Sequence, residues 1–352
     1  MKIPSSLQQI CHWRSERPWG NSCFHVMSKW PLIFLLAFIL AVSLRVTTPD
    51  ASGPRNLFRI GTGGLTGVYF PIGKLIAEGL TGTKTGGVPG YIGVAQNSAG
   101  SVENLRAVTA GEIEGGLVQA DVAAWAFHAE HVFAGAERAR SLRAVASLYP
   151  EKFQIVTRRD AGIRRVADLR GKRISIDETG SGTLVVMRIV LEAHGLSEND
   201  LQPVYLKPVF THDKMVKGDL QGFVMMAGAP MKAVTQLSDI GISLVPIAVD
   251  KARAINAQYP YLFPGAIPAN VYQGIPETPT LQVHALLVVN AAMPETLVYQ
   301  VTAALWSEQT LAMLQAGHAQ GRSITPETAL DGISIPLHAG AEKYYREKGM
   351  LP

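Results

Sequence analysis

The sequence predicts an α/β protein with two lobes, because three segments repeat the order strand, small-residue loop, helix. These segments are residues 58–80, 174–194 and 220–233. Strands in such units pair in parallel, and ligand contacts gather in the loops at their carboxyl ends. The chain has 352 residues, of which 47% are hydrophobic and 17% charged, which suits two packed domains of ordinary size.

The first unit begins with a strand that ends near Ile60 and continues into the glycine-dense turn 61–64. Apolar residues recur at helical spacing from about Thr66, so a helix follows, with Pro71 tolerated only in its first turn. A glycine loop that leads into a helix N-terminus leaves backbone N–H groups free and favours a bound anion.

Two nucleotide-binding patterns fail in this stretch. The dinucleotide fingerprint needs a glycine where the chain has Thr66, and no carboxylate follows Glu78 at the required distance. A phosphate loop needs four residues between its glycines and then Lys-Ser or Lys-Thr, whereas five residues separate Gly67 from Gly73. Neither nucleotide class is therefore predicted.

Next along the chain we expect strands at 91–95 and 116–118, a helix that begins at Ser101, and a helix capped by Asp121. Two further strands are expected, at 142–148 and 153–157. Small polar residues at helix starts are commonly N-caps. His128 and His131 have no third donor nearby for a metal, so they are interpreted as histidines of a surface helix.

The second lobe repeats the design with a strand at 174–176, a loop through Ser181 and Thr183, and a helix at 184–194 closed by Gly195. Hydroxyl donors next to helix N–H groups suit a carboxylate or a phosphate. The third unit turns at 227–230. Residues 259–276 are expected to form an extended connection near the hinge, before a strand at 284–289 and a helix at 294–308.

The N-terminal region predicts export. Residues 31–44 are an apolar run of signal-peptide length, so residues 1–45 are interpreted as a signal peptide or an uncleaved N-terminal anchor, and 46–56 as a linker. Both cysteines, Cys11 and Cys23, precede that run. Residues 1–45 also carry the whole net charge of +4, which leaves a neutral body and gives no support for nucleic-acid binding.

Four separated motifs resemble those of the TAXI-type solute-binding proteins, the periplasmic receptors of one class of tripartite ATP-independent periplasmic (TRAP) transporters. They are G-T-G-G-x-x-G-x-Y-F-P-x-G at 61–73, S-V-E-N-L at 101–105, G-L-V-Q-x-D-V-A at 116–123, and D-G-x-x-I-P-L-H-x-G-A-x-x-Y-Y at 331–345. The chain departs from the family at Leu65-Thr66, where small residues or glycine are more usual.

The resemblance implies a bilobal type II periplasmic-binding-protein fold, with two parallel or mixed-sheet lobes joined by two hinge strands. Lobe 1 would comprise 57–159 with 283–352, and lobe 2 would comprise 160–282. It further implies a periplasmic receptor, free or anchored by residues 31–44. The receptor would bind glutamate, 2-oxoglutarate or a C4-dicarboxylate and deliver it to the membrane subunit of a TRAP transporter, without cofactor, metal or enzymatic activity.

Backbone N–H groups of the glycine loops and nearby hydroxyls would then hold one carboxylate from both lobes, and Tyr69 or the Gln119 amide would contact the remainder. The expected ligand-binding residues are Gly63, Gly64, Thr66, Tyr69, Asn97, Ser98, Gln119, Asp121, Ser181, Gly182, Thr183, Gly228 and Ala229. Alternatives are a membrane-tethered ligand sensor, an enzyme that uses Asp121, Asp177 or Glu178, and an inorganic anion or a sulfonate as the ligand.

Overall fold

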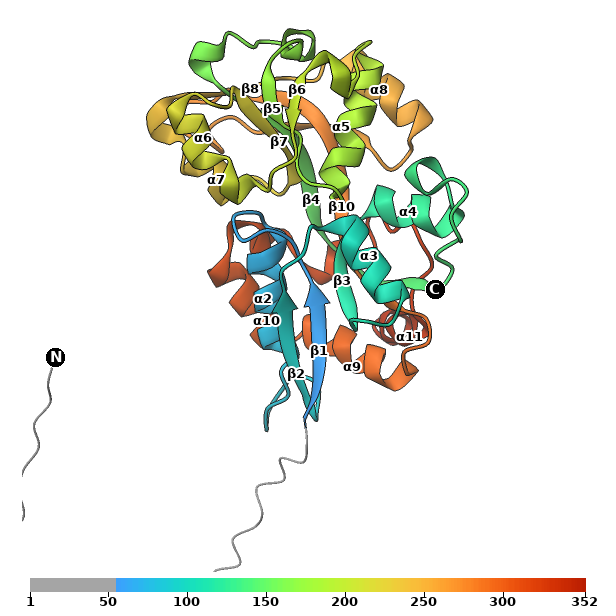
Figure 1. The fold of residues 1–352 in the computed structure, drawn as a ribbon. Coiled ribbons are helices and arrows are strands. Elements are labelled where there is room, and N and C mark those ends of the chain that lie inside the picture. Colours follow the sequence, from blue (N-terminus) through green and yellow to red (C-terminus); the bar gives the residue numbers. More distant parts are fainter. Residues whose placement is uncertain (1–54) are drawn as a thin grey trace, which may run out of the picture. The chain divides into compact units, whose positions relative to one another are not determined.

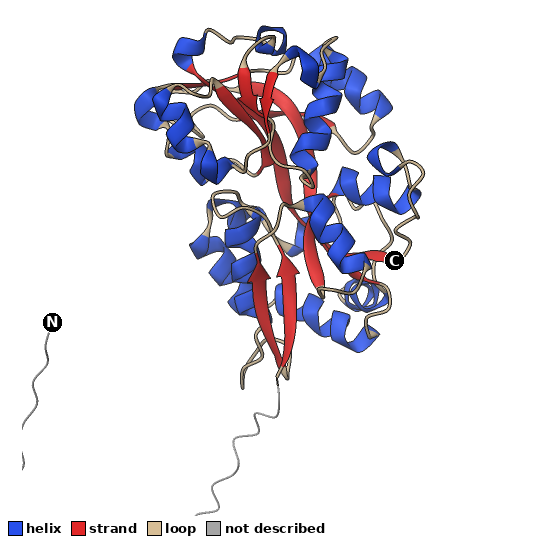
Figure 2. Cartoon of the chain, in the orientation of Figure 1, coloured by secondary structure: helices blue, strands red, loops and turns tan. Residues whose placement is uncertain are grey.

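One mixed β-sheet forms the centre of the fold (Figures 1 and 2), with its strands in the order β2-β1-β3-β10-β4-β7-β5-β6. Strand β8 pairs with β4, and β9 pairs with β10. The structure is a computed structural model that describes residues 55–352. The expected signal peptide or anchor, both cysteines and most of the expected linker lie outside these residues.

Two long antiparallel strands, β4 (Leu142–Arg158) and β10 (Thr278–Asn290), run through both halves of the sheet. The prediction of two separate strands at 142–148 and 153–157 was wrong, because β4 is continuous through Pro150. The pairing of β4 with β10 shifts in register beside this proline, between Ala285 and Leu286. The extra residue of this bulge is Leu148 of β4, whereas Pro150 lies opposite His284.

On one side of the long strands, three parallel-oriented strands and the helices that cover them form what we call lobe 1. The strands are β1 (Asn56–Gly61), β2 (Tyr91–Gln96) and β3 (Gly115–Gln119). The helices are α2 (Tyr69–Leu80), α3 (Ser101–Thr109), α4 (Ala120–His128), α9 (Glu295–Leu305), α10 (Glu308–Gly317) and α11 (Ala339–Glu347).

On the other side, a second group of strands and helices forms what we call lobe 2. Its strands are β5 (Arg173–Ser175), β6 (Gln202–Val204), β7 (Gly222–Ala227), β8 (Ile242–Leu244) and β9 (Phe263–Ile267). Its helices are α5 (Gly182–Ala193), α6 (His212–Lys217), α7 (Lys232–Thr235) and α8 (Val249–Gln258).

Two local predictions need correction. The helix expected at 294–308 is two helices, because the Ser307 side chain accepts a hydrogen bond from the Thr310 N–H at 3.2 Å and starts α10. The connection expected at 259–276 contains β9, which pairs with β10 from Phe263 onward. No helix within residues 55–352 combines the length and the apolar character that crossing a bilayer requires.

The core has two apolar clusters, one on each face of the sheet. Along β10, Leu287 and Val289 belong to one cluster, whereas Leu286 and Val288 belong to the other. This alternation is the period of two expected of a strand that is buried on both faces. The α/β fold with a mixed sheet is therefore confirmed, whereas the residue boundaries predicted for the two lobes stay predictions.

Candidate functional site

A cavity lies between lobe 1 and lobe 2, and the space not filled by atoms is about 460 Å³ when the open solvent at its mouth is included. Residues at the carboxyl ends of β1, β3, β5 and β7 contribute to its walls, as expected for an α/β sheet. Seven of the thirteen predicted site residues line it, and their role in ligand binding stays a prediction. They are Gly63, Gly64, Tyr69, Gln119, Ser181, Gly182 and Thr183.

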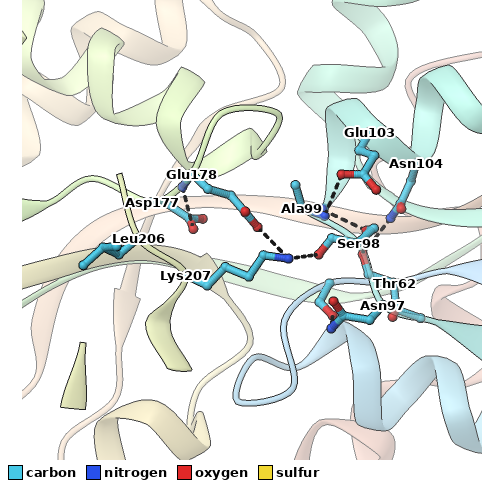
Figure 3. A network of polar contacts seen from close by, with 12 residues as sticks. Thr62, Asn97, Ser98, Ala99, Glu103, Asn104, Asp177, Glu178, Leu206 and Lys207 are labelled. Carbon is cyan, nitrogen blue, oxygen red and sulfur yellow. Dashed lines mark hydrogen bonds and ion pairs between the residues drawn. The ribbon is translucent and has the colours of Figure 1, made fainter. Parts of the chain in front are cut away.

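Two predicted residues, Asn97 and Ser98, support the first glycine loop from outside the cavity (Figure 3). The Asn97 side-chain amide donates to the Gly63 carbonyl at 2.7 Å, and the Ser98 hydroxyl donates to the Thr62 carbonyl at 3.0 Å. The Gly63 and Gly64 N–H groups themselves make no hydrogen bond to another residue in 55–352. They remain available to a ligand.

Gln119 is the residue that precedes α4, and its amide lines the cavity. Its backbone N–H donates to the Ser101 hydroxyl at 3.1 Å. Its side-chain oxygen is buried and has no hydrogen-bond partner within residues 55–352. A buried polar atom without a partner is costly, so this amide is a strong candidate for a ligand contact.

Asp121 lies inside the first turn of α4 and does not line the cavity, so its expected role as the helix cap was wrong. One of its carboxylate oxygens, Oδ1, accepts the Val122 N–H at 2.8 Å, whereas Oδ2 has no partner within residues 55–352. Complete burial raises the pKa of Asp121 to about 7.

The start of α5 supplies backbone donors from lobe 2. Ser181 is the N-cap, and its hydroxyl oxygen accepts the Leu184 N–H at 3.1 Å. The Thr183 hydroxyl oxygen accepts the Met226 N–H at 3.1 Å. Both hydroxyls are thus engaged within the protein, and the N–H groups of Gly182 and Thr183 are the donors left free by helix geometry.

Three predicted residues lie elsewhere, in contacts between the lobes. The Thr66 carbonyl accepts the Ala233 N–H at 3.2 Å, and the Thr66 side chain does not line the cavity. The Ala229 carbonyl accepts from the Gln320 side chain at 2.6 Å. A Cβ atom at Gly228 would lie 2.5 Å from Gln320, so the third loop packs against lobe 1 outside the cavity.

Further hydrogen bonds join the lobes at the edge of the cavity. The Lys207 ammonium lies 3.1 Å from the Glu178 carboxylate and donates to the Ser98 carbonyl of lobe 1 at 3.2 Å (Figure 3). The Gly180 carbonyl accepts the Val102 N–H, at 3.1 Å, from the start of α3. The lobes are therefore closed on each other in this structure.

Sequence reasoning missed Glu151 as a site residue, and it considered Asp177 only for an enzyme. Both line the cavity and are buried, with 1% and 4% of their surface exposed. Asp177 has φ 68°, in the left-handed region that aspartate tolerates better than most residues. The available signal for Glu151 was a carboxylate inside a long apolar strand, which is rare without a function or a partner.

The two histidines that the sequence assigned to a surface helix lie in different elements. His128 ends α4, whereas His131 follows in a short 3-10 helix and stacks on Tyr259 with ring centroids 5.1 Å apart. His131 does not line the cavity. Within residues 55–352 no group of three or more histidine, cysteine or acidic side chains is arranged to hold a metal ion.

Residues 60–349 match the model of the NMT1-like family. Solved structures with a similar fold include the aliphatic sulphonate-binding protein SsuA of Escherichia coli, with 16% identity, a TM-score of 0.41 and 83% of each chain covered. SsuA of Xanthomonas axonopodis pv. citri, bound to MOPS, has 17% identity and a TM-score of 0.43 over 85% of this chain and 96% of that one. A putative L-cystine transporter protein of Listeria monocytogenes has 13% identity and a TM-score of 0.45 over 78% and 99%. Because the family match covers most of the sequence, this chain belongs to the NMT1-like family.

Proposed function

We propose that the chain is a solute receptor that binds a small molecule between its lobes and closes on it. The observation that carries the proposal is the cavity itself, whose donors come from both lobes. The Gly63 and Gly64 N–H groups belong to lobe 1, and those of Gly182 and Thr183 belong to lobe 2. A solute held by both sets stabilises the closed arrangement over an open one, because only the closed arrangement offers both sets at once.

The finer proposal is a solute with a carboxylate, of the glutamate, 2-oxoglutarate or C4-dicarboxylate type. Free backbone N–H groups at a helix N-terminus favour an anionic oxygen. The unpartnered Gln119 side chain adds a second, independent point of contact. The resemblance to TAXI-type proteins supports a periplasmic location and delivery to the membrane subunit of a TRAP transporter. That the chain is not an enzyme remains an expectation.

Thermal unfolding in the presence of candidate solutes tests this function. The panel contains glutamate, glutamine, 2-oxoglutarate, succinate, malate, phosphate and a sulfonate. A solute at about 100 times its dissociation constant adds about 2.7 kcal/mol to the free energy of unfolding. For a chain of this size that raises the midpoint by several degrees. Such a shift with a carboxylate, and none with phosphate, supports the proposal.

A matched pair of variants connects the shift to the cavity. Gln119→Leu removes the unpartnered amide, whereas Gln258→Leu makes the same change at an exposed position of α8. We expect the first variant to lose most of the solute-induced shift and the second to keep it. No shift with any solute, for a protein that unfolds cooperatively, would contradict the carboxylate-receptor proposal.

A further inference from the structure

The cavity contains two buried carboxyl groups, and this feature is not explained by a site for an anion. Glu151 lies on β4 and Asp177 follows β5, so the two acids come from different strands of the sheet. Both line the cavity. In their ionised forms these carboxylates would repel an anionic group and attract a cationic one.

Among the residues that the structure describes, neither acid has a cationic partner. None of the ion pairs within residues 55–352 involves Glu151 or Asp177. The Tyr69 hydroxyl donates to Glu151 at 3.1 Å, and the Glu178 N–H donates to Asp177 at 2.9 Å. These neutral donors leave the charge of each carboxylate uncompensated.

The nearby lysines are already engaged. Lys207 is the one lysine or arginine among the described residues that line the cavity, and it contacts Glu178 and the Ser98 carbonyl. Lys152 follows Glu151 directly along β4, so its side chain points to the opposite face of the strand, where it bonds to Gln282. No lysine or arginine that lines the cavity within residues 55–352 is thus free to compensate an ionised Glu151 or Asp177, and a cationic group of a solute would do so.

Burial has the expected effect on both acids. It raises the pKa of Asp177 to about 7, and it raises the pKa of Glu151 well above its usual value, with the nearby Asp121 carboxylate adding to the effect. A buried acid without a cation keeps its proton. A cation placed beside it would favour the ionised form and gain a strong charge-assisted hydrogen bond.

We propose that Glu151 and Asp177 are specificity-determining residues that bind a primary ammonium group of the solute. This inference rests on the proposed receptor function and makes it more specific. The receptor selects solutes that carry both a carboxylate and an ammonium group over the matched solutes that lack the amine. Backbone N–H groups hold the carboxylate, and the two buried acids hold the ammonium.

The test measures affinity by calorimetry for solute pairs that differ by one amine: glutamate with glutarate, and alanine with propionate. We expect the amine-bearing member of at least one pair to bind at least about tenfold more tightly, which corresponds to about 1.4 kcal/mol. Titration of the unmodified protein in two buffers of different ionisation enthalpy should also show that the protein releases protons when the amine binds, because an acid becomes ionised.

Variants assign the effect to the two acids. Glu151→Gln keeps an acceptor for the Tyr69 hydroxyl, and Asp177→Asn suits the left-handed backbone, since asparagine tolerates positive φ. We expect each variant to weaken binding of the amine-bearing solute at least about tenfold and to leave the amine-free solute unaffected. The control, Glu327→Gln, changes an exposed glutamate outside the cavity and should alter neither affinity.

The outcomes separate the two proposals. Equal affinity within each pair, together with unchanged affinities in both variants, would overturn the ammonium site and leave the receptor standing. Tight binding of amine-free dicarboxylates, without binding of the amine-bearing solutes, would also overturn the ammonium site and leave the receptor standing. No binding of any panel member to the folded protein would overturn the receptor function on which this inference rests.

Discussion

Replacing Asp121 with asparagine should change how the stability of the protein depends on pH. Asp121 is completely buried in the first turn of α4, and burial raises its pKa from 3.8 to about 7. In the unfolded chain the same carboxyl ionises near pH 4 (about 3.9). The folded protein therefore holds a proton that the unfolded chain has lost between about pH 4 and pH 7.

The sign and size of the effect follow from this difference. Where the folded state binds more protons, the free energy of unfolding falls as pH rises, by about 1.4 kcal/mol per pH unit for one group. A shift of about three units therefore removes about 4 kcal/mol between about pH 4 and pH 7. Asparagine does not titrate, so Asp121→Asn abolishes this loss while its side-chain oxygen still accepts the Val122 N–H.

Urea unfolding followed by circular dichroism, at several pH values between about 5 and 8, measures the effect. The stability of Asp121→Asn relative to the unmodified protein should rise with pH up to about pH 7 and level off above it. Asp250→Asn is the matched control, because Asp250 lies in the first turn of α8 and is exposed. A stability difference between Asp121→Asn and the unmodified protein that stays constant with pH would refute the reasoning.

Three further variants test packing and closure. Leu287→Ala leaves a cavity under the central strand β10, where Leu287 is fully buried, and should cost about 2–5 kcal/mol in urea unfolding. Tyr345→Phe leaves the Trp306 indole N–H, now 2.9 Å from the tyrosine oxygen, without its partner, and should cost about 1–3 kcal/mol by the same assay. Gly182→Ala places a Cβ atom 2.4 Å from the Gln119 side-chain oxygen of the other lobe. It should lower solute affinity in calorimetry at least about tenfold, with little change in stability.

The repeated strand–loop–helix pattern was enough to predict the fold class, because each unit is encoded locally. The strand before Gly61, the start of α3 at Ser101 and the positive φ of Gly195 after α5 were all predicted from neighbouring residues. The continuity of β4 through Pro150 could not be predicted this way. It depends on pairing with β10, which lies more than a hundred residues away along the chain.

The parts of the candidate site that depend on neighbouring residues in the sequence were also predictable. Residues of the glycine loops reached the cavity because such loops follow strands, which end at the same edge of the sheet. Gly228 and Ala229 belong to a loop of the same kind, but Gln320 from lobe 1 packs against it and closes it off. Glu151 was missed because the prediction placed it between two separate strands, so the burial of its carboxylate inside one continuous strand was not expected.

The two buried acids of the cavity would link the selectivity of the receptor for its solute to the closure of its lobes. In the closed protein without solute, Glu151 and Asp177 are shielded from water and have no cationic partner within residues 55–352, which disfavours closure. The contact of Lys207 with Ser98 at the cavity edge favours closure whether or not a solute is present. A solute that brings a cation removes the cost of burying the two acids and keeps the contact of Lys207 with Ser98. It therefore shifts the population towards the closed form. A solute of the same shape without the cation leaves the cost in place, so the amount by which the receptor closes should follow the charge that the solute supplies.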